Sequence, residues 1–87
     1  MRFTVEERHL TDSSGRPVAA PDGVSFHSCE AENLDECVQT FLARDQAELI
    51  GDVLKFPGFQ AVATVRKTSG VYTLQITPAS QRNMPAL

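Results

Sequence analysis

Residues 59–77, FQAVATVRKTSGVYTLQIT, decide the fold of this chain of 87 residues. Apolar and polar side chains alternate on both sides of the polar segment Lys67–Gly70, as in two half-buried strands joined by a turn. A four-residue loop at this segment sets the strand register. It pairs Val65 with Tyr72, Ala63 with Leu74 and Ala61 with Ile76. Small residues then face large ones, so the sequence predicts a hairpin against which a helix can pack closely.

Two further strands are predicted near the N-terminus. Residues 2–10 alternate, with Phe3 and Val5 on the inner face. Residues 24–30 form a second short strand, and the simplest pairing of the two is a hairpin. Between them, residues 11–23 are rich in glycine, proline and serine. We therefore expect a long surface loop there.

One amphipathic helix is predicted to begin after Asn33, whose side chain can cap the first turn while Glu36 reaches back. Its apolar stripe consists of Leu34, Cys37, Val38, Phe41 and Leu42. The next position on this stripe is a carboxylate, Asp45. We expect the helix to break there, with Asp45 as the N-cap of a second helical piece. A helix that runs on and a functional carboxylate at Asp45 are the alternatives.

The segment after this break fits two structures. Residues 49–54 have apolar spacing that suits a helix, but Asp52–Phe56 suits a short strand equally well. Periodicity does not separate the two in so short an apolar run.

The predicted fold class is therefore α+β. An antiparallel sheet is formed by two N-terminal strands and the C-terminal hairpin, and one amphipathic helix packs on one face. We expect a single domain over residues 1–79 and a flexible C-terminal tail over residues 80–87, because little in that tail can be buried.

Charge and composition exclude several partner classes. Eleven acidic residues against eight basic ones give a net charge of −3, and only Arg66 and Lys67 are adjacent bases, so nucleic-acid binding is not expected. The chain has no apolar run long enough to cross a membrane, and Met1–Glu7 lacks the apolar core of a signal peptide. Two cysteines are too few for a secreted disulfide framework. A cytoplasmic protein with free thiols is the expectation.

Soft-ligand side chains give the only candidate chemistry. Cys29 and His27 are two apart on the polar face of a strand, where the imidazole can act as base toward the thiol. No nucleophile turn or phosphate-binding glycine loop accompanies them. A metal site with Cys37 and His9 lacks paired ligand spacing, so we expect no metal and no cofactor.

These observations favour a small non-catalytic interaction or regulatory protein that acts as a homo-oligomer. Val62 and Val71 project from the outer face of the hairpin, where a lone helix cannot also reach, and are the expected interaction residues. A second copy or another protein is the expected partner. One alternative is a small-ligand-binding protein with a pocket between helix and hairpin. The other is a thiol enzyme that uses His27 and Cys29.

Overall fold

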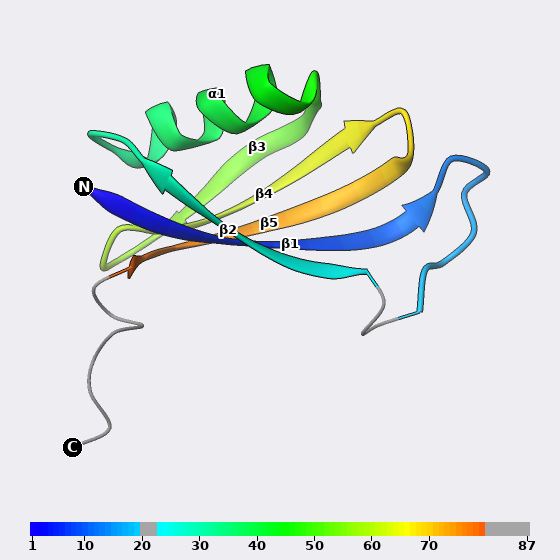
Figure 1. The fold of residues 1–87 in the computed structure, drawn as a ribbon, viewed down its shortest axis with the longest axis horizontal. Helices are drawn as coiled ribbons and strands as arrows, with labels where there is room; N and C mark the ends of the chain where they lie inside the picture. Colours follow the sequence, from blue (N-terminus) through cyan, green and yellow to red (C-terminus); the bar gives the residue numbers. More distant parts are fainter. Residues whose placement is uncertain (20–22, 80–87) are drawn as a thin grey trace.

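The computed structural model describes residues 1–19 and 23–79, which form one sheet with a helix on one face (Figure 1). In chain order the elements are β1 (Arg2–Asp12), β2 (Val24–Glu30), α1 (Leu34–Asp45), β3 (Glu48–Phe56), β4 (Gln60–Lys67) and β5 (Gly70–Pro78). All neighbouring strands are antiparallel, in the order β2-β1-β5-β4-β3. The expected tail, residues 80–87, lies outside the described residues, as do residues 20–22 of the expected loop.

The prediction of an α+β fold class is wrong, because the chain is mostly β. Of the described residues, 59% are in strands and 17% are helical. The difference comes from β3, a strand of nine residues in a segment that the sequence left open between helix and strand. One helix of twelve residues therefore faces a five-stranded sheet.

The C-terminal hairpin has the predicted register. Val65 pairs with Tyr72, Ala63 with Leu74 and Ala61 with Ile76. The N-terminal hairpin between β1 and β2 is also present, and β1 joins the two hairpins by pairing with β5. The two hairpins thus form one continuous sheet, to which β3 adds an edge strand.

The helix begins as predicted but ends differently. Asn33 Oδ1 accepts a hydrogen bond of 2.8 Å from the Glu36 N–H, which caps the first turn. Asp45 is the last helical residue and not an N-cap, so that prediction is wrong. Gln46 takes a left-handed conformation with φ of 52°, its N–H donates to the Ala43 carbonyl, and the Ala47 N–H donates to the Leu42 carbonyl. This closing turn leads directly into β3.

β3 resolves the ambiguity that the sequence left. Its apolar residues recur every four positions, as Leu49 with Val53 and Ile50 with Leu54, which is a spacing that also fits a helix. In the strand, these two pairs lie on opposite faces of the sheet. Leu49 and Val53 pack against the core, whereas Leu54 is exposed. The register shifts between Ile50 and Leu54, and Gly51 in this bulge has φ of +72°. In such a bulge, one strand has extra residues that are not paired with residues of the neighbouring strand.

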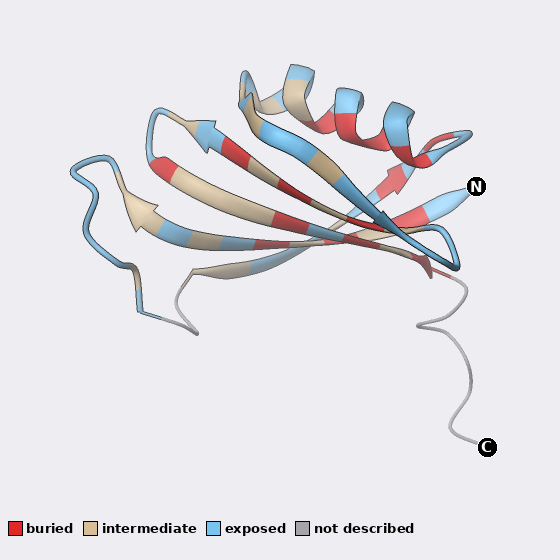
Figure 2. Ribbon diagram, turned by 180° about the vertical axis from the view of Figure 1, so that it is seen from behind, coloured by how far each residue is buried: buried red, intermediate tan, exposed pale blue. Residues whose placement is uncertain are grey.

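The core lies between α1 and the sheet face that α1 covers, which we call the inner face (Figure 2). The sheet contributes Phe3, Val5, Ala61, Ala63, Val65, Leu74 and Ile76, and the helix contributes Leu34, Cys37, Val38 and Phe41. Alanine side chains under the helix leave room for its large residues, as the hairpin sequence predicted.

β2 has the opposite orientation to the one expected. Cys29, assigned to a polar face, is 7% exposed and belongs to the core, whereas Phe26 is 57% exposed on the other side. The cause is the pairing with β1, in which Phe3 lies opposite Cys29 and Val5 opposite His27. Because paired residues share a sheet face, the strong apolar phase of β1 determines the phase of the weakly patterned β2.

Candidate functional site

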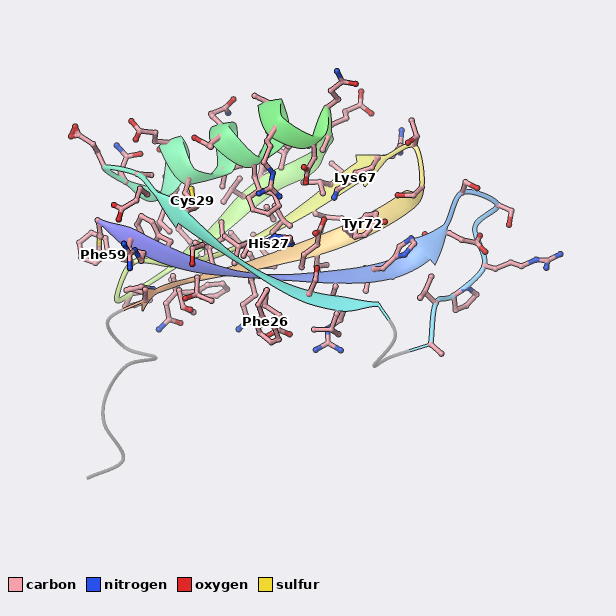
Figure 3. The ribbon with its side chains drawn as sticks, in the orientation of Figure 1. Phe26, His27, Cys29, Phe59, Lys67 and Tyr72 are labelled. Atoms are coloured by element: carbon pink, nitrogen blue, oxygen red, sulfur yellow. The ribbon has the colours of Figure 1, made fainter. Side chains whose placement is uncertain are left out.

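Four ionisable side chains meet on the inner face near the C-terminal end of α1. Glu7 comes from β1, His27 from β2, Asp45 from the end of α1 and Lys67 from the end of β4. We call these four residues the charged cluster. In Figure 3, His27 and Lys67 lie on the helix side of the sheet, opposite to Phe26. The strand alternation that places Phe3 and Val5 in the core also places Glu7 there.

Glu7 is the most buried member of the charged cluster, with 5% of the residue exposed. Its Oε1 accepts a hydrogen bond of 3.0 Å from His27 Nε2 and a longer one of 3.4 Å from Ser25 Oγ. Its Oε2 is inaccessible to solvent and forms an ion pair with Lys67 Nζ. A carboxylate this buried requires such compensation, because an unpaired charge inside a protein is strongly destabilising.

Lys67 and Asp45 hold each other in the charged form. Lys67 Nζ lies 3.0 Å from Asp45 Oδ2, and Arg44 Nε donates to Asp45 Oδ1 at 3.0 Å. Burial by itself lowers the pKa of Lys67, but the hydrogen bonds from its ammonium to Glu7 and Asp45 outweigh burial, and the pKa is raised. The hydrogen bonds from Arg44, and then Lys67, lower the pKa of Asp45 against the opposing effect of burial. Lys67 is therefore not a nucleophilic amine, and Asp45 is not a general acid near neutral pH.

Tyr72 lies between two side chains that cover both faces of its ring. The His9 ring stacks on it with centroids 4.1 Å apart, and Lys67 Nζ lies 4.5 Å from the ring centroid. The Tyr72 hydroxyl is 2.6 Å from Ser69 Oγ. His9 Nε2 donates to the Ser69 carbonyl at 3.0 Å, because a carbonyl oxygen can only accept. The two rings are thus fixed in place beside the charged cluster.

A pocket of about 280 Å³ opens beside these side chains. Its lining consists of Glu7, His9, Gly23, Val24, Ser25, Lys67 and Tyr72. The volume lies just below the range of about 300–1,000 Å³ for small-molecule sites. Sequence reasoning missed this pocket, although the carboxylate at Glu7, in phase with Phe3 and Val5, was a signal for it.

The structure gives His27 and Cys29 different partners. His27 Nε2 is the atom that bonds Glu7, and the same nitrogen lies 3.2 Å from Ser25 Oγ. A catalytic triad uses the two ring nitrogens separately, so this arrangement does not relay a proton from Ser25 to Glu7. Cys29 lies beside Cys37, whose pKa burial and the neighbouring Cys29 thiol raise to about 12. Cys37 is therefore a poor nucleophile, and Cys29 is buried beside it with 7% of the residue exposed.

The opposite side of the sheet, which we call the outer face, is covered by no element within residues 1–19 and 23–79 (Figures 1 and 2). Its residues are Thr4, Glu6, Arg8, Val24, Phe26, Ser28, Ile50, Leu54, Phe56, Val62, Thr64, Val71, Thr73, Gln75 and Thr77. Val62 and Val71 lie on this face as predicted, and both are half-buried. Sequence reasoning missed Phe26, Leu54 and Phe56, because it gave β2 the wrong phase and left β3 undecided.

One row of residues crosses the whole outer face. From β2 to β3 the paired positions are Phe26, Glu6, Gln75, Val62 and Leu54. The ends of this row are apolar and its centre is polar. Phe26 and Leu54 are each 57% exposed, which is large for apolar side chains at both edges of one sheet face.

The charges around the outer face cancel in pairs. Arg2 Nε lies 3.1 Å from Glu30 Oε1, Arg8 pairs with Glu6 at 2.9 Å, and Arg66 pairs with Glu48 at 3.3 Å. Each pair joins residues on the same side of the sheet. The acidic excess of the chain therefore lies elsewhere.

Comparisons with family models, with curated proteins and with solved structures gave no significant match. No helix in the described part of the chain is long and apolar enough to cross a membrane.

Proposed function

We propose that this chain is a non-catalytic interaction protein that works as a homo-oligomer, and that two copies join through their outer faces. The observation that carries the proposal is the outer face itself. It is apolar at both edges, and its charged side chains form ion pairs that leave no net charge. No described element covers it. A small fold with one helix for two sheet faces stabilises itself when a second copy covers the remaining face.

Charge favours the outer face as the contact between copies. The helix side carries Glu32, Asp35, Glu36, Asp45 and Glu7 against Arg44, Lys55 and Lys67. Two helix sides therefore repel each other, whereas two outer faces bring no net charge together. A second copy is thus a better occupant for the outer face than a strongly charged partner.

The row across the sheet is self-complementary. A two-fold axis along the strands places Phe26 of one copy over Leu54 of the other, with Gln75 over Gln75 at the centre. A two-fold axis across the strands places apolar edges together as well. Five strands spaced about 4.8 Å apart, with three rows of outward side chains, cover roughly 500 Å² per copy. Twice this area, about 1,000 Å², is the lower limit for a specific interface. Association at micromolar concentration is therefore expected.

Sedimentation velocity across the micromolar range tests this proposal. We expect wild-type protein to shift from monomer to dimer as concentration rises, and Leu54→Asp to remain monomeric over the same range. Gln39→Asp, which adds the same charge to an exposed position of α1, is the matched control and should dimerise like wild type. A monomeric wild type throughout the range, or a dimer unaffected by Leu54→Asp, would contradict the proposal.

We also propose a cytoplasmic location. Both cysteines are free thiols, which a reducing compartment maintains. Fractionation of cells that express the tagged chain tests this, and recovery with the membrane or secreted fraction would refute it.

A further inference from the structure

We infer that Cys29 and Cys37 form a redox-active thiol pair, which hydrogen peroxide oxidises reversibly to a disulfide within one chain. The two are the only cysteines of the sequence, and both are free thiols in the structure. They belong to the core on the inner side of the sheet, and Figure 3 shows Cys29 on the same side as the helix. The inference is therefore independent of the proposed homo-oligomer and its outer face.

The fold brings the two thiols into contact from separate elements. Cys29 comes from β2 and Cys37 from α1, and both are part of the core between the sheet and the helix. The Cys37 thiol interacts with the Cys29 thiol through a side-chain hydrogen bond. A disulfide requires two cysteines whose side chains point toward each other, and a hydrogen bond between the thiols meets this requirement.

A short and well-bonded corner holds the two cysteines in place. Cys29 is the last but one residue of β2, and Cys37 lies in the first turn of α1. Between them, the Glu32 N–H donates to Glu36 Oε1 at 3.0 Å, and the Cys37 N–H donates to the Asn33 carbonyl at 3.1 Å. A disulfide at this corner closes only the connection 30–36, and it fixes the start of the helix to the edge of the sheet.

The two thiols differ in their access to solvent. Cys29 is 7% exposed in a strand at the edge of the sheet, whereas Cys37 is 0% exposed. The pKa of the Cys37 thiol is raised to about 12 by burial and by the neighbouring Cys29 thiol, so Cys37 stays protonated. A small oxidant therefore reaches Cys29 first. An accessible thiol next to a second thiol that resolves its oxidised form is typical of reversible redox pairs.

Hydrogen peroxide supplies the oxidation, because it is little larger than water. In the first step Cys29 Sγ attacks a peroxide oxygen, the O–O bond breaks, and a sulfenic acid and one water form. In the second step Cys37 Sγ attacks Cys29 Sγ, the S–O bond breaks, and hydroxide leaves as water with the Cys37 proton. Two thiols and one peroxide thus give one disulfide and two waters, and two electrons pass from sulfur to oxygen. Contact between the thiols makes the second step intramolecular, which compensates for the poor nucleophilicity of Cys37.

Peptide mass spectrometry of the folded full chain tests the inference. No lysine or arginine lies between Cys29 and Cys37, so trypsin leaves both in one peptide, and this peptide contains neither methionine. The folded protein is treated with hydrogen peroxide, at a concentration that oxidises both thiols of the chain in urea. Remaining thiols are then alkylated in urea. We expect the peptide to lose two hydrogens and to take up no alkyl group, and dithiothreitol to restore both thiols.

Other results for this peptide would overturn the inference. Alkylation of both cysteines after peroxide treatment would mean that the folded protein excludes the oxidant. A disulfide that joins two chains would mean that the thiols do not react with each other. Addition of oxygen to either sulfur without the loss of two hydrogens would mean that the second thiol does not resolve the first.

Two variants separate the roles of the thiols. Cys37→Ala removes the resolving thiol, so peroxide should convert Cys29 to a sulfenic acid that a cyclic dione traps. Cys29→Ala is the matched variant, and its Cys37 should be oxidised at least about tenfold more slowly, because that thiol is buried and protonated. Equal rates in the two variants would contradict the assignment. If either variant fails to fold, the wild-type peptide alone decides.

Discussion

Lys67→Met is expected to lower the free energy of unfolding by about 3 kcal/mol, the lower end of the cost of breaking a buried ion pair. Lys67 is only 16% exposed, and its loss leaves Glu7 charged inside the protein. His27 and Ser25 still donate to Glu7 Oε1, which keeps the cost from being higher. Asp45 retains Arg44 and contributes little to the loss.

The double variant Glu7→Leu with Lys67→Met separates burial of charge from loss of packing. Both side chains then become apolar, and no unpaired charge remains on the inner face. We expect the free energy of unfolding of the double variant to lie within about 1 kcal/mol of the wild-type value, because well-packed apolar residues replace buried ion pairs at little cost. The coupling energy between the two positions should therefore exceed 2 kcal/mol, in the upper part of the range of roughly 0.5–3 kcal/mol for residues in contact.

Urea unfolding followed by circular dichroism gives these free energies. Lys55→Met is the control, because Lys55 is half-exposed and its ion pair with Asp35, at 2.8 Å, is on the surface. Surface pairs contribute at most about 1 kcal/mol. If Lys67→Met costs no more than Lys55→Met, the charged cluster is not an interdependent buried network and the reasoning fails.

Three further predictions follow from particular contacts. Cys29 and Cys37 are both buried, and the pKa of Cys37 is raised to about 12. A thiol reagent should therefore label neither cysteine in native buffer and both in urea. Rapid labelling of Cys29 in native buffer would show that β2 is misplaced. Gly70 has φ of +133°, and Gly70→Ala puts a Cβ into the backbone of β1, so this variant should fail to fold or lose several kcal/mol of stability. Gly15 has φ of +86° but open space around it, so Gly15→Ala should cost only about 1 kcal/mol in urea unfolding. The pKa of Asp45 is lowered in the folded protein, so its carboxylate stabilises the fold above the pKa of the unfolded state. This stabilisation is lost as the pH falls through the pKa of the folded state. The free energy of unfolding should therefore decline below about pH 4, and Asp45→Asn should flatten this part of its pH profile.

The sequence alone determined the features that depend on local pattern. The hairpin register follows from alternation and a short loop, and the helix start follows from Asn33 and Glu36. The outward placement of Val62 and Val71 follows from the same alternation. These features need no information from distant residues, because period and turn chemistry act over a few positions.

Tertiary structure alone decided which residues share a face or a charge. β2 buries Cys29 because it pairs with β1, whose apolar phase is the stronger, and its own sequence fits either orientation. β3 became a strand because β4 offered it an edge, although its apolar spacing also fits a helix. Glu7, Asp45 and Lys67 come from three separate elements, so their ion pairs exist only once the sheet has closed under the helix.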